Sequence, residues 1–501
     1  MHDPVKHHTK VNNFQSRRRF ILLTSVSSII ALVTPPIYRL RANPLNKNPL
    51  NKNPFSLGVA SGDPDHKSVI IWTRLYFPQG GWTVYDPGPL EVSWTVYDDP
   101  SGKIIVSRGV VITDSSQAHC VSILVDGLYE NRHYWYQFEC SGFTSRMGRT
   151  RTLPHPDQHN TQLSFALVSC QHFEDGYFVG YQDILSRNPD FIIHVGDYIY
   201  ESGSMVAFPV RQHGTGIPTD LDGYRERHAL YKMDADLAEA HAQFPFLVIW
   251  DDHEVENDYA GNQSKDLHPP SYFSPRRKAA YQAFFEHIPM RQTIKNSEKN
   301  STVYRDLTYG TLANFLMLDC RSFRDPQPCN PSHLGGGRTT GWCPEMLDPQ
   351  RSMLGFNQEQ WVIDQLTNSR TRWNILVQTT LMSRLNRGGQ LERYFNDGWD
   401  GYPESRDRIV KAIAGLKTSN TVVFGGDLHA FFASHLHLDS LDPQSPIIAS
   451  NFVASSLTRP DKNPSRHEDW KQYNPNLVYS SGTHRGYLWC ELSQERSEEH
   501  T

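Results

Sequence analysis

The sequence predicts two folded parts, a small all-β sandwich over about residues 55–155 and a mixed α/β domain over about residues 160–490. The chain has 501 residues, which is more than one ordinary hydrophobic core covers. Short alternating segments between turn residues fill the first part, and this spacing is typical of a β-sandwich. In the second part, apolar runs of strand length alternate with longer amphipathic stretches, which is typical of an α/β fold.

Ahead of the sandwich, residues 1–42 have the features of an export signal. Ser16-Arg17-Arg18-Arg19-Phe20 places consecutive arginines directly before the apolar run 20–33, which is too short to span a bilayer comfortably. The arrangement resembles the twin-arginine signal, which implies the twin-arginine translocation machinery as a partner and a periplasmic or secreted location. The alternative is a basic patch before a buried helix. Residues 43–54 repeat Leu-Asn-Lys-Asn-Pro, which indicates a linker, and no later segment is predicted to form a stable membrane span.

The expected sandwich consists of at least five short strands. Leu90-Glu91-Val92-Ser93-Trp94-Thr95-Val96-Tyr97 alternates with period two, as a half-buried strand does. The stretch that joins Leu128-Tyr129 to Tyr134-Trp135-Tyr136 resembles fibronectin-type modules, so a fibronectin/Ig-like sandwich is expected. The other expected strands are 69–75, 104–112, 120–128 and 133–140.

The expected α/β domain places buried strands between helices. Arg225, Arg227 and His228 are interpreted as the solvated face of one polar helix. The end of the chain, 491–501, is polar and without period, so no structure is predicted there. The expected strands lie at 165–168, 191–195, 246–250, 375–377 and 422–424, and the expected helices near 177–187, 226–243, 276–287, 358–368 and 407–417.

Seven cysteines in an exported chain permit disulfides. Cys120 and Cys140 lie in two strand-like runs and could pair across strands. Cys329 and Cys343 bracket a Gly-rich loop and could close it.

Polar clusters follow the apolar strands of the α/β domain, at the ends where open α/β sheets place their ligand sites. Together they supply carboxylates, imidazoles, a thiol and a phenol, which are the ligands of a site for more than one cation. A carboxylate that bridges two cations suits phosphoryl transfer, because the pair holds both the attacking and the leaving oxygen. The clusters are Ser169-Cys170-Gln171-His172, Gly196-Asp197-Tyr198-Ile199-Tyr200-Glu201, Asp251-Asp252-His253-Glu254-Val255-Glu256-Asn257 and Gly425-Gly426-Asp427-Leu428-His429, with Gln378-Thr379-Thr380 as a weaker fifth.

These clusters resemble the plan of the calcineurin-like metallophosphoesterases, and in detail the branch of PhoD-type alkaline phosphatases. Ser169-Cys170-Gln171, Trp250-Asp251-Asp252-His253-Glu254 and Gly426-Asp427-Leu428-His429 carry the resemblance, together with the opening Leu57-Gly58-Val59-Ala60-Ser61-Gly62-Asp63-Pro64. The resemblance covers about residues 55–490. It implies a calcineurin-like two-sheet α/β (α+β) catalytic domain behind the sandwich.

The resemblance also implies a mixed site of Fe³⁺ and Ca²⁺, with other divalent cations such as Zn²⁺ as the alternative. Cys170, Asp197, Tyr200 and His429 would hold the iron. Asp197 would bridge to calcium, for which Asp252 and Asp427 are further ligands and Asn257 is a candidate. His253, with Asp252 beside it, is assigned to catalysis, where it would orient the phosphate or protonate the leaving oxygen. Gln378 stands where related enzymes have a histidine ligand, so a direct metal bond or a water-mediated contact is open there.

The predicted function is that of an exported, metal-dependent phosphoesterase that hydrolyses phosphate mono- and diesters through metal-activated hydroxide. A phospholipase D-like diesterase and a non-catalytic metal- or glycan-binding protein are the alternatives. The formal net charge of −5 gives no electrostatic signature of nucleic-acid binding. Taken singly, Cys170 could be an inert buried thiol and Tyr200 a core aromatic; Asp251 is expected to turn the loop rather than to bind metal.

Overall fold

The computed structural model describes residues 50, 52–78, 86–291, 302–416 and 420–501. All of these belong to one compact unit, Asn48–Thr501. The predicted export signal and residues 43–49 and 51 of the predicted linker lie outside the described residues.

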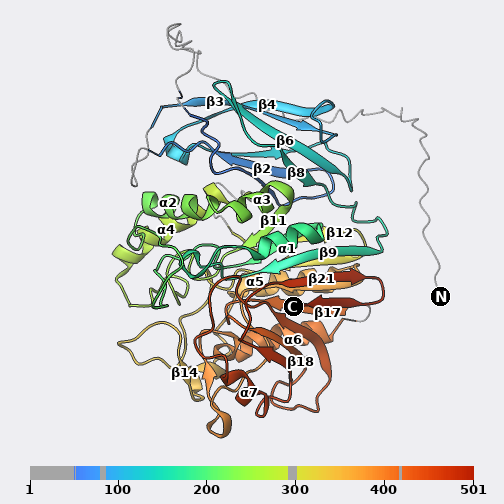
Figure 1. The fold of residues 1–501 in the computed structure, drawn as a ribbon. Helices are drawn as coiled ribbons and strands as arrows, with labels where there is room; N and C mark the ends of the chain where they lie inside the picture. The colour runs from blue at the N-terminus through green and yellow to red at the C-terminus, as the bar shows by residue number, and fades with distance from the viewer. Residues whose placement is uncertain (1–49, 51, 79–85, 292–301, 417–419) are drawn as a thin grey trace, which may run out of the picture. The chain divides into compact units, whose positions relative to one another are not determined.

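Two large sheets stack face to face and form the frame of the molecule (Figure 1). The first has the order β22-β21-β9-β10-β11-β1-β2-β5, and the second the order β12-β13-β15-β17-β19-β18-β20. In the first sheet lie β1 (Val59–Gly62), β2 (Val69–Arg74), β5 (Cys120–Val125), β9 (Gln162–Val168), β10 (Phe191–Val195), β11 (Pro245–Ile249), β21 (Leu488–Ser493) and β22 (Ser497–His500). In the second lie β12 (Arg305–Tyr309), β13 (Ala313–Met317), β15 (Trp373–Val377), β17 (Asn420–Gly425), β18 (Phe431–His437), β19 (Ile447–Val453) and β20 (Leu477–Ser481).

Aromatic side chains fill the space between the two sheets. Phe165 of β9 packs edge-on against Phe315 of β13 and Phe424 of β17, with ring centroids 5.4 and 5.7 Å apart. Strands with buried residues on both faces are continuous apolar runs, because neither face meets water. This explains why Phe165-Ala166-Leu167-Val168 shows no alternation in the sequence.

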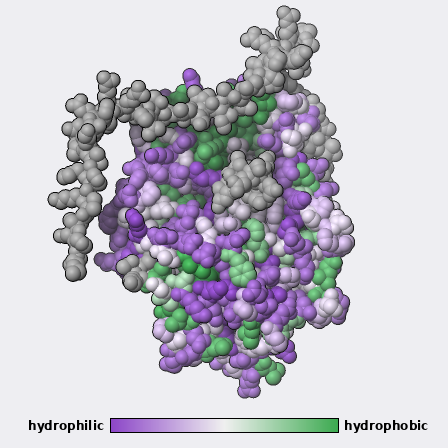
Figure 2. All heavy atoms as spheres, turned by 180° about the vertical axis from the view of Figure 1, so that it is seen from behind, coloured by the Kyte–Doolittle hydropathy of each residue, from purple (hydrophilic) through white to green (hydrophobic). Residues whose placement is uncertain are grey.

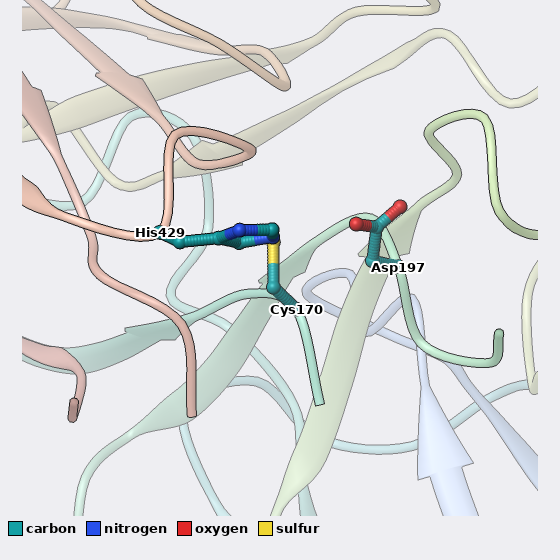
Figure 3. Close-up of side chains that lie close together, drawn as sticks. All are labelled: Cys170, Asp197 and His429. Carbon is teal, nitrogen blue, oxygen red and sulfur yellow. The ribbon is translucent and has the colours of Figure 1, made fainter. Parts of the chain in front are cut away.

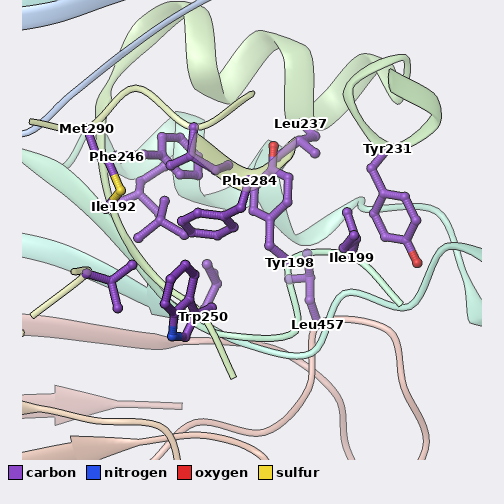
Figure 4. Close-up of a cluster of buried hydrophobic side chains, with 14 of the residues drawn as sticks. Ile192, Tyr198, Ile199, Tyr231, Leu237, Phe246, Trp250, Phe284, Met290 and Leu457 are labelled. Atoms are coloured by element: carbon purple, nitrogen blue, oxygen red, sulfur yellow. The ribbon is translucent and has the colours of Figure 1, made fainter. Parts of the chain in front are cut away.

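Helices cover the outer face of each sheet. Trp250 and Phe284 meet at 5.2 Å in the core beneath the helices on the first sheet (Figure 4). The helices on that side are α1 (Gly180–Arg187), α2 (Leu221–Lys232), α3 (Ala235–Gln243) and α4 (Pro270–His287); on the second sheet they are α5 (Phe356–Asn368) and α6 (Pro403–Ala414), and α7 (Arg466–Lys471) packs near β20.

The N-terminal part is a sandwich that shares a sheet with the rest of the molecule. One layer is the sheet β4-β3-β6-β7, with β8 paired to β6, and the other is the β1-β2-β5 end of the large sheet. β1 runs parallel to β11, with Gly62 opposite Phe246. A Cβ at Gly62 would lie 2.1 Å from the Pro289 carbonyl oxygen, so only glycine allows this close approach. The strands of the separate layer are β3 (Leu90–Tyr97), β4 (Ile105–Thr113), β6 (His133–Cys140), β7 (Phe143–Thr144) and β8 (Gly148–Arg151); β14 (Thr339–Thr340) and β16 (Tyr394–Phe395) form a separate pair.

Three sequence expectations about local structure are wrong. The single helix near 226–243 is two helices, because the side chain of Asp234 accepts the amide hydrogens of Asp236 and Leu237 and starts α3 anew. The expected solvated face of α2 is buried: Arg225 pairs with Glu286 at 2.6 Å. The end of the chain forms β22, whose backbone pairs with β21; an edge strand can form by backbone pairing without an apolar face.

The cysteines follow one of the two expected pairings. Cys329 and Cys343 form a disulfide across 14 residues. Cys120 and Cys140, the other expected pair, are both free and buried.

Within the described part of the chain, no helix is long and apolar enough to cross a membrane. On the face shown in Figure 2, hydrophilic residues predominate, and apolar ones gather in small groups among them.

Candidate metal centre

The candidate ligands lie on turns that follow neighbouring strands. β9, β10 and β11 are parallel and adjacent, so their carboxyl ends meet at one edge, and β17 of the facing sheet brings a fourth turn to the same place. Four non-glycine residues on these turns have positive φ: Cys170 (55°), Asp197 (56°), Asp427 (63°) and His429 (56°). Non-glycine residues in this region are strained, and such strain gathers where a function requires a set geometry.

Two groups of possible ligands share one carboxylate. Atoms of Cys170, Asp197 and His429 lie within 4.8 Å of one another, and so do atoms of Asp197, Asp252 and His253. Figure 3 shows the thiol of Cys170 and the ring of His429 pointing toward each other, with the carboxylate of Asp197 beside them. Asp197 therefore has the place of a carboxylate that bridges two cations.

Tyr200 completes the first group. Its hydroxyl donates to the Asp197 Oδ2 at 2.7 Å and lies 3.5 Å from the His429 Nε2. The Cys170 Sγ lies 2.8 Å from the Ser169 Oγ. The phenol therefore contacts two members of the cluster, Asp197 and His429.

The electrostatics of this group favour a bound cation. Burial, together with the charge of Asp197, raises the pKa of both Cys170 and Tyr200 well above their ordinary values. Burial also raises the pKa of Asp197, even though His253 opposes the shift. The buried Oδ1 atoms of Asp197 and Asp252 have no hydrogen-bond partner among the described residues. Buried anionic donors with unused lone pairs are suitable ligands for multivalent cations. A bound cation would lower the raised pKa values of Cys170, Tyr200 and Asp197.

The remaining predicted ligands lie around the second group. The Asp252 Oδ2 accepts the amide hydrogen of Asp258 at 2.6 Å. Although burial opposes ionisation, Arg321 and His253 hold the pKa of Asp252 below its usual range. Asp427 accepts from the Thr380 Oγ1 at 3.1 Å, and the backbone N–H of Asn257 donates to Glu201 at 3.0 Å. Asp427 is not a member of either tight group.

His253 is held by a carboxylate that the sequence analysis did not assign. Its Nδ1 lies 2.6 Å from the Glu201 Oε2, and its ring packs on that of Tyr200 at 4.1 Å. Burial lowers the pKa of His253, but Glu201, Asp197 and Asp252 outweigh it and raise the pKa well above its ordinary value. Glu201 comes directly after Tyr200, so its place in the polar cluster was the signal available in the sequence.

Glu254 is a second residue that the sequence analysis left without a role. Its carboxylate accepts the amide hydrogens of Asp197 (3.2 Å), Tyr198 (2.6 Å) and Asp251 (2.8 Å), and so ties the turn after β10 to the turn after β11. Burial raises the pKa of Glu254 to about 8 although these donors favour the carboxylate, and cations in the adjoining groups would favour it further.

Asp251 and Gln378 are occupied by protein partners. Asp251 pairs with Arg321 at 2.6 Å, which agrees with a structural role. The Gln378 amide donates to the Thr380 and Phe424 carbonyls, and its oxygen accepts from Thr380 and Trp399 at 3.0 Å each. These bonds use the donors and acceptors of the amide, which argues against either metal contact that the sequence left open.

A cavity of about 1380 Å³ lies between α4 and the segment around Leu354–Gln358, and none of the predicted ligands lines it. The candidate metal centre is therefore defined by its donor set and not by this cavity.

Comparisons with known proteins decide the family. Residues 165–501 match the family model described as PhoD-like phosphatase, and residues 41–154 match the PhoD-like phosphatase N-terminal domain. The chain belongs to the PhoD-like phosphatase family. It is 38% identical over 449 residues to alkaline phosphatase D of Bacillus subtilis (strain 168), which covers 88% of this chain and 76% of that protein. It is also similar to the solved structure of PhoD, with a TM-score of 0.84, 35% identity and 90% of each chain covered.

Membership in this family establishes a phosphoesterase, that is, a hydrolase of phosphoric ester bonds. It confirms the resemblance stated from the polar clusters. The similarity to the solved structure supports the mixed α/β fold, and the two possible cation groups agree with a metal-dependent enzyme.

Proposed function

We propose that the two ligand groups bind Fe³⁺ and Ca²⁺ and that the chain hydrolyses phosphate mono- and diesters with their help. The observation that carries the proposal is the carboxylate of Asp197, which belongs to both groups. A shared carboxylate beside a histidine–glutamate pair supplies both charge neutralisation and proton transfer.

The donor set decides which cation each group suits. Cys170, Asp197, Tyr200 and His429 would hold Fe³⁺, because thiolate and phenolate are strong anionic donors that suit a trivalent ion. Asp197, Asp252 and Asp427 would hold Ca²⁺, which prefers carboxylate oxygens, with Asn257 as a further candidate. When bound, the cations would neutralise the charge on phosphate oxygens and polarise the attacking water.

The chain's own residues would complete the reaction. Water supplies the oxygen of the new P–O bond, and the P–O bond to the alcohol breaks. His253, held at its Nδ1 by Glu201, would give the proton of its other ring nitrogen to the departing alkoxide. The proton that water releases restores the imidazolium. Asp252 would contribute as a ligand and as a charge that keeps His253 protonated.

Residues 1–42 would direct the folded chain through the twin-arginine machinery to the periplasm or beyond. The support is the run Ser16-Arg17-Arg18-Arg19-Phe20. Replacing Arg17 and Arg18 by Lys is expected to leave precursor in the cytoplasm, and export of that variant at the normal rate would contradict the proposal.

Elemental analysis and visible absorption of protein from its native host test the metals. Phenolate and thiolate bound to iron should absorb visible light, and Tyr200→Phe should shift or bleach that band and weaken iron retention. Tyr181→Phe, which changes another fully buried tyrosine, is the control and should leave the band unchanged. A colourless, iron-free protein that is fully active with zinc or calcium alone would rule out the iron assignment.

A further inference from the structure

Arg387 is a half-buried guanidinium with no acidic partner. It lies over the ring of Phe395 at 4.5 Å and near that of Trp470 at 5.3 Å. Its Nε has no hydrogen-bond partner, and no carboxylate of the described residues forms an ion pair with it. Aromatic faces orient a guanidinium and remove part of its water without cancelling its charge. The side chain is therefore held ready for an anion that the protein itself does not supply.

Two other arginines in this region stack on aromatic rings in the same way, but each also forms an ion pair. Arg466 also lies over Trp470, at 4.8 Å, but it pairs with Asp461 at 3.2 Å. Arg384 lies over Tyr394 at 5.0 Å and pairs with Glu392 at 3.0 Å. Stacking without an ion pair therefore sets Arg387 apart from both.

The carboxylates that influence Arg387 are already engaged. Burial lowers the pKa of Arg387, and the charges of Asp427, Asp400 and Asp461 oppose this shift. Asp461 binds Arg466 and His467, and Asp400 binds Arg406 at 2.7 Å. Asp427 is a predicted ligand of the metal centre. None of the three is free to neutralise Arg387 once the cations are bound.

A chain of contacts links Arg387 to the turn after β17. Arg387 packs on the ring of Phe395, whose carbonyl accepts the amide hydrogen of Gly398 at 3.4 Å. A Cβ at Gly398 would lie 3.9 Å from the Thr380 Oγ1, which donates to Asp427 at 3.1 Å. Burial, with Arg466, lowers the pKa of Arg387 to about 10, and the side chain is still charged at the pH of any ordinary assay.

We propose that Arg387 anchors an anion subsite that binds a second negatively charged group of the substrate, away from the phosphorus that reacts. This rests on the proposed function, because it assigns a further contact to the same reaction. The ligand is a phosphoryl or carboxylate group on the alcohol part of the ester, since a planar guanidinium binds either one with two parallel hydrogen bonds. Arg387 is then a specificity residue that favours doubly anionic esters over esters of neutral alcohols.

Matched substrates that differ by one anionic group test the subsite on the full metal-loaded chain. Fructose 1,6-bisphosphate is compared with fructose 6-phosphate, and 3-phosphoglycerate with glycerol 3-phosphate. The readout is the ratio of kcat/KM within each pair. We expect the doubly anionic member to be preferred, and Arg387→Met to lower the ratio about tenfold or more, since a charge-assisted hydrogen bond is lost while the packing against the rings is kept. A fall only in the first pair assigns the subsite to phosphoryl groups, and a fall only in the second assigns it to carboxylates.

Arg466→Met is the control, because it changes an arginine on the same tryptophan that already has an acidic partner. It should leave both ratios unchanged. Ratios near one in the wild type, ratios that Arg387→Met does not lower, or an equal loss in Arg466→Met would each overturn the subsite. If the wild type turns over none of the four esters, the proposed function fails instead. In that case calorimetry measures the dissociation constant of each ester, and the ratio of the two constants is taken within each pair. A weaker preference for the doubly anionic ester in Arg387→Met alone supports the subsite, and an unchanged preference overturns it.

Discussion

Two neighbouring groups of buried acids balance their charges in different ways. In one, Asp251 and Asp397 both pair with Arg321, at 2.6 and 2.8 Å, and Asp397 also meets Arg324 at 3.2 Å. In the other, the Asp197 carboxylate accepts a hydrogen bond from Tyr200 but has no ion pair with any lysine or arginine of the described chain. Both groups are equally removed from water.

The presence or absence of an arginine partner distinguishes carboxylates with a structural role from candidate metal ligands. Buried charges cost folding free energy unless they are paired. Arg321 and Arg324 supply that pairing inside the first group. In the second group Asp197 has no such partner in the described chain, and the proposed cations would supply the missing positive charge.

The largest expected effect comes from removing the shared carboxylate. Asp197→Asn should lower kcat to below about one-thousandth of the wild-type value, because it weakens both cation sites at once. Elemental analysis of the purified variant should show loss of both metals. A variant that keeps both metals and most of its activity would show that Asp197 does not bridge.

Stability measurements on the metal-free protein sharpen this result. The folded pKa of Asp197 is raised above its unfolded value, so the folded state binds more protons and loses stability as the pH rises above about 4. Asp197→Asn removes that loss. We therefore expect metal-free Asp197→Asn to unfold at the same or a higher urea concentration than metal-free wild type at pH 7, with the gap closing near pH 4.

The second effect concerns chemistry without metal loss. His253→Ala should lower kcat by ~10²–10⁴-fold, the usual contribution of a general acid, while both metals remain bound. Glu201→Gln is the companion variant, because it keeps the size of the side chain but weakens the hold on the His253 Nδ1. It should move the alkaline limb of the pH–rate profile to lower pH, since Glu201 is the largest influence that raises the pKa of His253. Loss of metal from folded His253→Ala would make His253 a ligand.

The third effect tests the group with internal pairing. Arg321→Met should lower the free energy of unfolding by about 3–5 kcal/mol, because Asp251 and Asp397 are left buried without their partner. For Asp397 the sign is opposite to that for Asp197, whereas burial raises the pKa of Asp251 despite Arg321. Arg321 and Arg324 outweigh burial and hold the folded pKa of Asp397 below its unfolded value, so wild-type stability is gained above about pH 4 and lost as the pH falls further. Arg321→Met should flatten this dependence in urea titrations at several pH values. An unchanged pH dependence would contradict the assigned pairing.

The sequence predicted the ends of strands better than their partners. Apolar runs in the sequence predicted β9, β10, β11 and β17, because such runs depend on local pattern alone. The polar residues that follow these runs identified Cys170 as a candidate ligand, and the structure places it with Asp197 and His429. The pairing of Gly62 in β1 with Phe246 in β11, 184 residues apart, leaves no such pattern. The union of β1 with β11 depends on Gly62 approaching the backbone at Pro289, which only the fold reveals.

Residues that act through other residues escaped the sequence analysis for the same reason. Glu201 and Glu254 were visible as members of polar clusters, but their roles depend on which ring or amide they meet. The buried face of α2 was misjudged because Arg225 and Arg227 look like surface residues until Glu286 and the carbonyls of Tyr200 and Glu201 are placed beside them. Composition indicates charge, and only packing shows how the charge is balanced.

The smallest expected effect comes from the carboxylate that ties the two ligand turns together. Glu254 accepts three amide hydrogens, from Asp197, Tyr198 and Asp251, and Glu254→Gln would turn an amide NH₂ toward at least one of those donors. The turn would relax and Asp197 would lose its set position, so metal affinity should fall by about 10–100-fold, as it does when a partner that orients a ligand is removed. Equilibrium dialysis against buffered calcium measures the change.

Glu256→Gln is the matched control, two residues away on the same loop, where the carboxylate binds Arg276 and the Ser264 Oγ rather than the ligand turns. That variant should lose stability but keep its calcium affinity. An equal fall in affinity in both variants would mean that the loop as a whole, and not the Glu254 carboxylate, holds Asp197 in place.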